Sequence, residues 1–401
     1  MPPTRAILST GAGALALALA LAGCSTGTAG GASESHGAAH VKVTLTGGGS
    51  SDTCALDTTT AAAGPVTFTV ENTSSTAITE VEILSDQRII GEKENLAPGL
   101  KASSFTLTLG GGTYQVYCPG AEKEMQDFRV TGKATASPTG SVNALLKKGT
   151  GGYGEYVAGV LSDMTTAVGT LQTAVDSGDV DAAKRAYALA RPFYEKVESD
   201  VDGFLLPGTA ATDNAGNLDY LIDMRASNLD PAVGWHGFHA IERDLWTTGI
   251  TDGTKTLAAE LVTNVGKLAD LAKGLSYKPE DLANGAAALL EEVQANKITG
   301  EEELYSHLDI VDFAANVEGA QQAFAYLQPG LKKIDPGLTK QVAAQFDKVT
   351  AALDGYRDPA QVGGYRLYDA ATRAADATKL SRLVQSLQTP LSKIAEKVAT
   401  A

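Results

Sequence analysis

The stretch Gly237-Phe238-His239-Ala240-Ile241-Glu242 contains a histidine and a glutamate three positions apart. A helix turns by about 100° per residue, so His239 and Glu242 are expected on one helical face, one turn apart. An apolar band lies beside that face and predicts that it points into a packed interior (Phe238, Ile241 and Leu245). Buried imidazole and carboxylate groups need partners. The pattern therefore predicts either a metal site or a buried hydrogen bond between the two side chains without a ligand.

The composition limits the kinds of partner that this chain can have. With 401 residues and 43% hydrophobic content, it is long enough for two or three folded units. It carries 47 Asp and Glu residues against 32 Lys and Arg residues, for a formal charge of −15. Nucleic-acid binding needs a basic surface, so this balance argues against it and favours cations as partners.

Residues 1–24 have the pattern of an export signal, with a basic start at Arg5 and a short apolar run. That run is too short to span a bilayer. It ends in Leu21-Ala22-Gly23-Cys24, which resembles a bacterial lipobox and implies acylation of Cys24 after cleavage. We then expect a lipid anchor on the outer side of the cytoplasmic membrane, in the cell envelope, with ordinary secretion as the alternative. Residues 25–40 are rich in Ser, Gly, Ala and Thr and predict a flexible tether.

Residues 41–132 consist of short alternating runs separated by Gly, Pro, Asn and Asp, a pattern that predicts a small β-sandwich. The order of these runs and the late segment Tyr114-Gln115-Val116-Tyr117-Cys118 resemble a cupredoxin-like domain. A blue-copper centre takes two histidines and a cysteine. This segment contains no histidine, so we do not expect blue-copper electron transfer.

Cys54 and Cys118 lie near the first and last strands of the predicted sandwich. In an exported protein, a disulfide between them is the default expectation. The alternative is a second metal or redox site formed by both cysteines with Met125, together with Glu80 or Glu82 on one strand face.

After a predicted linker at residues 133–140, the apolar period becomes helical, which predicts an all-α domain over residues 141–401. Asp230-Pro231 is expected to cap and open the helix that carries His239. Pro192 is expected to kink or restart the helix that begins at Val180. Further helices are expected near residues 255–274, 279–295, 300–328, 336–355 and 377–398.

Thr299-Gly300-Glu301-Glu302 is a capping-box pattern and predicts that one of these helices begins there. A helical wheel counted from that start places a polar stripe between two apolar flanks (Glu302, Tyr305, Asp309, Asp312 and Asn316). Such a stripe is expected to line an interior cleft, as a metal or substrate groove or as a structural polar network. The same wheel places Glu303 and His307 toward solvent.

Three separated motifs are similar to those of the imelysin-like family, once labelled a metallopeptidase family: Tyr194-Glu195-Lys196-Val197-Glu198, Gly237-x-His239-x-x-Glu242 and the segment 299–309. The resemblance implies a helical bundle in which His239 and Glu242 ligate a metal, with Glu260 as a further candidate. Together with the cupredoxin-like domain and the export signal, the chain resembles the iron-binding components of Efe-type bacterial uptake systems. That implies Fe(II) or Fe(III) as cargo, and a membrane permease and a haem peroxidase as partners.

The candidate metal ligands are one imidazole and several carboxylates (His239, Glu242, Glu260, Glu302, Asp309 and Asp312). This hard donor set suits iron, manganese or zinc better than Cu(I). Iron is the expected cargo, and zinc and copper are the alternatives. A peptidase is a second possibility, but a zincin needs two histidines near its glutamate, and Arg243 directly follows Glu242. A third possibility is a non-catalytic surface protein that binds a partner through an acidic groove.

Overall fold

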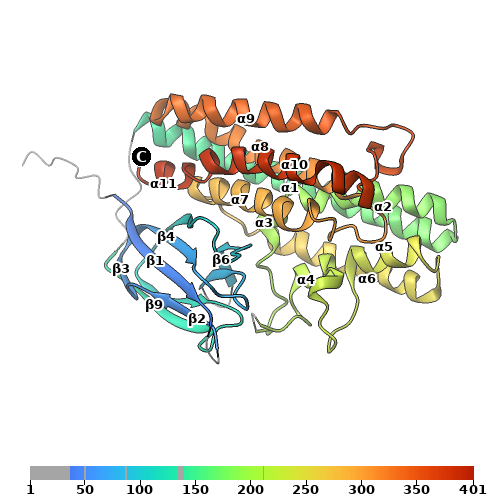
Figure 1. The fold of residues 1–401 in the computed structure, drawn as a ribbon, viewed down its shortest axis with the longest axis horizontal. Helices are drawn as coiled ribbons and strands as arrows, with labels where there is room; N and C mark the ends of the chain where they lie inside the picture. Colours follow the sequence, from blue (N-terminus) through green and yellow to red (C-terminus); the bar gives the residue numbers. More distant parts are fainter. Residues whose placement is uncertain (1–36, 49–50, 86–87, 134–139, 211) are drawn as a thin grey trace, which may run out of the picture. The chain divides into compact units, whose positions relative to one another are not determined.

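The computed structural model describes residues 37–401, apart from residues 49–50, 86–87, 134–139 and 211. The predicted export signal, Cys24 and most of the tether lie outside the described residues. Strands fill the first part of the described chain and helices the rest, which confirms the predicted fold class (Figure 1). Among the described residues, no helix has both the length and the apolar character needed to cross a membrane.

The N-terminal region contains two β-sheets. One has the strand order β2-β1-β4-β7 and the other the order β3-β9-β8-β5-β6. Phe68 on β4 stacks on Phe105 of its own sheet and meets Phe128 of the other sheet edge-on, at 5.3 Å between ring centroids in each case. The alternating apolar residues therefore form the core between the sheets. The strand bounds are β1 Ala39–Thr46, β2 Thr53–Leu56, β3 Thr60–Ala62, β4 Gly64–Asn72, β5 Val81–Ser85, β6 Arg88–Lys93, β7 Ser103–Leu109, β8 Gly112–Tyr117 and β9 Met125–Thr131.

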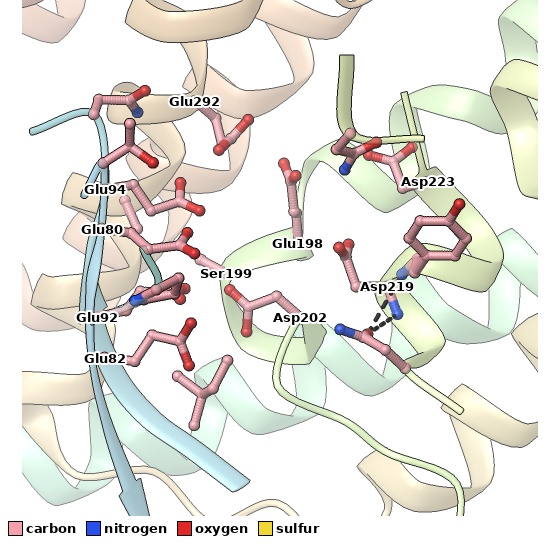
Figure 2. Close-up of a pocket in the computed structure, with 18 of the residues that line it drawn as sticks. Glu80, Glu82, Glu92, Glu94, Glu198, Ser199, Asp202, Asp219, Asp223 and Glu292 are labelled. Atoms are coloured by element: carbon pink, nitrogen blue, oxygen red, sulfur yellow. Dashed lines mark hydrogen bonds between the residues drawn. The ribbon is translucent and has the colours of Figure 1, made fainter. Parts of the chain in front are cut away.

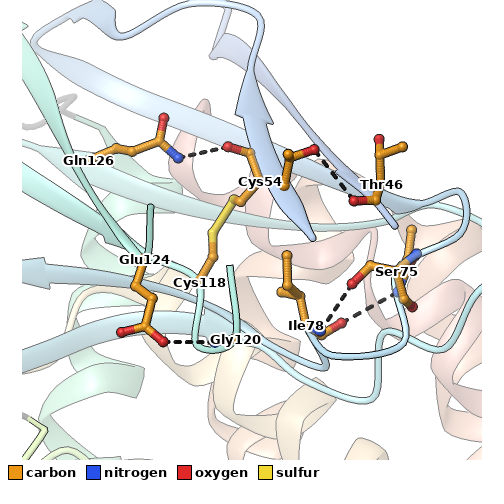
Figure 3. The surroundings of a disulfide bond; sticks show 10 residues. Thr46, Cys54, Ser75, Ile78, Cys118, Gly120, Glu124 and Gln126 are labelled. Carbon is orange, nitrogen blue, oxygen red and sulfur yellow. Dashed lines mark hydrogen bonds between the residues drawn. A yellow bond between two sulfur atoms is a disulfide. The ribbon is translucent and has the colours of Figure 1, made fainter. Parts of the chain in front are cut away.

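A disulfide joins Cys54 on β2 to Cys118 just after β8, and so links the two sheets (Figure 3). The backbone carbonyl of Cys54 also accepts a hydrogen bond from Gln126 Nε2 at 2.7 Å. Because both sulfur atoms are in the bond, the alternative in which two free thiols and Met125 bind a metal is wrong for this structure. Met125 begins β9 and pairs in register with Tyr117.

The C-terminal region is a helical bundle whose long first helix, α1, packs against α2, α6 and α8. The apolar residues of α1 at three- and four-residue spacing are buried, as the sequence pattern predicts. The helix bounds are α1 Ser141–Ser177, α2 Val180–Glu195, α3 Glu198–Val201, α4 Leu218–Asp223, α5 Gly237–Trp246, α6 Asp252–Ala272, α7 Pro279–Glu292, α8 Asp309–Ile334, α9 Pro336–Asp354, α10 Ala370–Leu391 and α11 Ile394–Ala399.

Two local helix predictions were wrong. The helix expected from the capping box at Thr299 begins only at Asp309, after a π-helical turn over Val293–Lys297 and a series of tight turns. The helix that carries His239 was expected to open at Asp230-Pro231, but it begins at Gly237. Helix α2 continues through Pro192 to Glu195, so no restart occurs there. Helix α2 and the segment before α8 both contribute side chains to the same buried polar centre, described below, so tertiary contacts override the local signals.

Hydrogen bonds and an ion pair connect the β-region to α7. The side chain of Asn284 bonds to both backbone groups of Thr106, with Nδ2 2.7 Å from the carbonyl oxygen. Lys93 at the end of β6 forms an ion pair with Glu291. These contacts place β5 and β6 close to the helices that carry acidic residues.

We expect the disulfide to stabilise the β-region, because it shortens the unfolded chain by closing a loop between residues 64 positions apart. Replacing both cysteines by serine should lower the free energy of unfolding by about 2–4 kcal/mol. Denaturant unfolding followed by circular dichroism measures this change. An unchanged midpoint in the double variant would contradict it, and adding reductant to the wild type should reproduce the loss.

Candidate metal centre

Gly237 fixes the position of the helix that carries His239. Its φ is +69°, and a Cβ at this position would lie 2.0 Å from the carbonyl oxygen of Ile222. Only glycine tolerates both the backbone conformation and the close approach. The start of α5 therefore lies against the end of α4, and His239 lies beside Asp223.

His239 is buried among three carboxylates. Its Nδ1 lies 3.2 Å from Glu242 Oε2, and its Nε2 lies 3.6 Å from Asp223 Oδ1 and 3.5 Å from Glu302 Oε1. Burial opposes the charge of the ring, but its hydrogen bonds to Glu242 and Glu302 raise the pKa of His239 well above its usual range. An ion that binds Nε2 must therefore replace the proton on that nitrogen. One donor atom from each of Asp223, His239 and Glu302 falls within 4.8 Å of the others.

Glu242 has both carboxylate oxygens engaged. Its Oε2 faces His239, and its Oε1 accepts hydrogen bonds from the backbone amides of Tyr305 and Ser306, at 2.8 and 2.7 Å. These amides belong to the segment that was predicted to be helical. Glu242 binds them instead, and Asp309 binds the amide of Glu303 at 3.2 Å. This explains why α8 begins only at Asp309.

Two buried cations share the centre with the carboxylates. Arg191 Nη1 lies 2.7 Å from Asp223 Oδ1, and Nη2 lies 2.7 Å from Glu302 Oε1 and 3.4 Å from His239 Nε2. Lys297 Nζ lies 3.1 Å from both Glu195 and Glu302. Arg191 thus contacts the same three donor atoms that could hold a metal ion.

The sequence profile of the imelysin family matches residues 149–394. The chain belongs to the imelysin family. It is also 34% identical over 364 residues to the iron uptake system component EfeO of Escherichia coli K12, a match that covers 90% of this chain and 89% of that relative. The same values hold for the EfeO proteins of Shigella flexneri and of Escherichia coli O157:H7. This match is longer than the imelysin region and therefore includes much of the β-region.

The buried carboxylates around His239 outnumber the buried cations there, and this excess of negative charge shifts the pKa values of the carboxylates. Burial, only partly offset by Arg191, raises the pKa of Asp223 to about 8. Burial together with the charge of Glu242 raises the pKa of Glu303 to about 7. Burial also opposes the charge of Glu302, but Lys297 and Arg225 hold its pKa well below its usual range. The centre therefore holds protons near neutral pH that a metal ion could replace.

Other predicted ligands have different surroundings. Asp309 and Asp312 are buried, as expected, but Asp309 binds the amide of Glu303, and Asp312 lies 3.7 Å from Arg191 Nε. Glu260 is half-exposed and lies 3.3 Å from His236, so neither of these two residues reaches the centre. None of these three acids falls in a compact donor group with His239 among the described residues.

Glu303 was expected to face solvent, and this was wrong. It is fully buried, accepts a hydrogen bond from the Tyr187 hydroxyl at 2.7 Å, and also binds the hydroxyl of Ser306. With His239 and Glu242 it forms a second compact donor group. Because both of its oxygens are already hydrogen-bonded, this second group is less available to a metal than the first.

Sequence reasoning missed Asp223, Arg191 and Lys297. Their roles depend on contacts between helices far apart in the sequence. The one local signal was a charged residue within or beside an apolar run, which more often marks a solvated face.

We expect the metal-free protein to lose thermal stability as the pH rises from about 5 to about 8. Asp223 and Glu303 have folded-state pKa values of about 8 and about 7, above the ordinary values of these acids. The protonated forms of these two acids contribute to the stability of the fold. This contribution is complete below the pKa of the unfolded chain and is lost as the pH rises through the pKa of the folded state.

Melting curves in the presence of a chelator measure this dependence. The Asp223→Asn variant should show a shallower decline than the wild type, because the substituted side chain does not titrate. A melting temperature that increases over this range would contradict the expectation.

Proposed function

We propose that the chain is an extracytoplasmic, membrane-anchored iron-binding component of an Efe-type uptake system, which captures Fe(II) or Fe(III) and passes it to a membrane permease. The identity to EfeO over most of both chains supports this proposal. The structural observation that carries it is the compact buried group of Asp223, His239 and Glu302. One imidazole and two carboxylates form a hard donor set that suits iron in either oxidation state.

In this proposal, His239 Nε2 and one oxygen each from Asp223 and Glu302 bind the ion directly. Glu242 does not bind the ion in this proposal but holds the ligand His239. It accepts the Nδ1 proton of His239 and is itself held by two backbone amides, so it fixes the orientation of the ring. The HxxE pair thus divides into one ligand and one positioning residue, which refines the expectation that both residues ligate the metal.

Arg191 must move when the ion binds, because its guanidinium contacts all three ligand atoms. Other acids are within reach: Glu195 already pairs with Nη2, and Glu303 and Asp312 lie 3.6 and 3.7 Å from Nε. The guanidinium can therefore exchange partners without becoming a buried charge without a counterion. Release of the ion to the permease reverses this exchange.

The remaining parts of the proposal concern delivery. A lipid anchor at Cys24 would hold the carrier close to the permease and raise the effective concentration for transfer. A haem peroxidase of the same system is the expected second partner. Iron is the proposed cargo rather than a resident cofactor.

Metal titration of variants tests the proposed roles. Fe(II) under anaerobic conditions and Fe(III)-citrate are titrated into the wild type and into His239→Ala, Asp223→Asn and Glu242→Gln. We expect the first two variants to lose high-affinity binding. Glu242→Gln should weaken it by about 10–100-fold, as is typical when a residue that orients a ligand is changed.

The exposed imidazole of His40 provides the matched control, and His40→Ala should bind iron like the wild type. Circular dichroism confirms that each variant is folded. Unchanged affinity in a folded His239→Ala variant would overturn the assignment. Equal loss in Glu242→Gln and His239→Ala would instead make Glu242 a direct ligand.

A further inference from the structure

Lysines gather at one end of the helical bundle, which we call the basic end. It consists of three segments: the start of α1 (141–150), the corner between α8 and α9 (329–343) and the region around α11 (388–401). Their charged side chains are seven lysines and only two acids (Lys147, Lys148, Lys332, Lys333, Lys340, Lys393 and Lys397, with Asp335 and Glu396). The whole chain has a formal charge of −15, so this end is opposite in sign to the rest.

Packing brings the three segments together. A Cβ at Gly149 of α1 would lie 2.2 Å from the carbonyl oxygen of Tyr326 on α8, so the start of α1 lies directly against the last turns of α8. Helix α9 follows α8 at once, and Asp335 caps its start. Lys397 of α11 forms an ion pair with the same Asp335, at 2.9 Å. The lysines of α1, α8, α9 and α11 therefore share one end of the bundle.

Most of these lysines are available to a partner. Six of them are exposed and form no ion pair with another of the described residues (Lys147, Lys148, Lys332, Lys333, Lys340 and Lys393). Both acids of the basic end already have partners, because Asp335 pairs with Lys397 and Glu396 lies 3.8 Å from His40 Nε2. The positive charge of this end is therefore not balanced within the described chain.

Helix stability explains only some of the lysines. Lys332 and Lys333 lie in the last turn of α8, where cations interact favourably with the helix dipole. By contrast, Lys147, Lys148 and Lys340 lie near the starts of α1 and α9, whose first turns contain no acids. Their charges add to the partial positive charge of two helix N-termini instead of compensating it. They raise the positive potential at this end, which attracts anions.

The acidic side chains gather on other elements. Figure 2 shows carboxylates of β5, β6 and α3, among them Glu82, Glu92 and Glu198, directed toward one another across a cavity. None of the residues that line this cavity belongs to the three segments of the basic end. Because the two signs of charge are separated, an anionic surface can select the basic end in spite of the negative net charge.

The chain also enters the described fold at the basic end. His40, near the start of β1, lies beside Glu396 of α11. Strand β1 begins at Ala39, 15 positions after Cys24, which is the expected site of acylation. A chain of this length spans at most about 50 Å when fully extended. A lipid anchor at Cys24 would therefore keep the basic end, and not a random face of the protein, within reach of the membrane.

We propose that the basic end docks on the anionic phospholipid headgroups of the membrane that carries the anchor. Clustered lysines close to an anionic bilayer each add to the binding free energy, and the phosphate groups supply the missing counter-charge. An anchor at Cys24 holds only one point of the chain, whereas docking of this end also fixes the orientation of the helical bundle. The inference rests on the membrane attachment in the proposed function, but it does not depend on iron binding.

Vesicle cosedimentation tests the docking face. The metal-free chain of residues 25–401 includes every described residue and lacks the acylated cysteine, so any binding comes from the protein surface. It is mixed with vesicles of phosphatidylcholine alone, or of phosphatidylcholine with one-third phosphatidylglycerol. We expect binding to the anionic vesicles only, and its loss when salt rises from about 0.05 M to about 0.5 M, because salt screens these charges. Equal binding to neutral vesicles, or to neither kind, would overturn the proposal.

A triple variant at the basic end makes the test specific. Lys147→Gln/Lys332→Gln/Lys340→Gln should bind anionic vesicles at least about tenfold more weakly than the wild type, because each lysine near the bilayer contributes. Wild-type affinity in this variant would contradict the assignment. His239→Ala should bind vesicles normally, so a failure of the iron-binding proposal and a failure of this one are distinguishable.

The matched control makes the same change in net charge at exposed lysines on other elements (Lys123→Gln/Lys267→Gln/Lys379→Gln). It should bind anionic vesicles like the wild type, and circular dichroism confirms that both triple variants are folded. An equal loss in the two triple variants would show that only the net charge matters and would remove the docking face.

Amine labelling of the wild type gives a second measurement that needs no variant. On anionic vesicles, Lys147, Lys332 and Lys340 should react more slowly with an acetylating reagent, whereas Lys123 and Lys267 should keep their rates. Mass spectrometry of the digested chain gives the rate at each position. Protection that is uniform, or that falls on the control lysines, would place the membrane contact elsewhere and overturn the proposal.

Discussion

The ion-pair network around Arg191 is the constraint on which the helical region depends. A guanidinium that is 1% exposed must be surrounded by acids, and these come from α2, α4, the segment before α8 and α8 itself. Apart from the pair with Glu195, which lies on α2 with Arg191, each contact fixes the relative position of two elements that are distant in the sequence. Loss of the cation would leave buried carboxylates without a counterion, which is among the most destabilising changes in a protein interior.

In the proposed function, the same network also accommodates a metal ion. Its acids exceed its basic groups, so some of them hold protons near neutral pH, as the raised pKa values of Asp223 and Glu303 indicate. In that proposal, an entering metal ion would displace protons and shift Arg191 onto other acids, so the total charge of the centre would change little.

Much of the fold could be predicted from sequence, because strand and helix periodicities are local. The alternating runs and the stripe of α1 predicted the two regions correctly, and the expected export of the chain favoured a disulfide between Cys54 and Cys118. The site was harder to predict. His239 was found because its partner Glu242 is one turn away, whereas Asp223 and Arg191 reach it only through tertiary packing. The capping box at Thr299 misled the helix prediction because Glu242 and Asp309 bind the amides that a helix would have used.

Anomalous diffraction at the iron absorption edge tests the central claim most directly. Crystals of the iron-loaded chain should show a peak bonded to His239 Nε2 and to oxygens of Asp223 and Glu302, with Glu242 still held by the amides of Tyr305 and Ser306. The Arg191 guanidinium should have moved toward Glu195 and Asp312. A peak elsewhere, with Arg191 still bridging Asp223 and Glu302, would contradict the account.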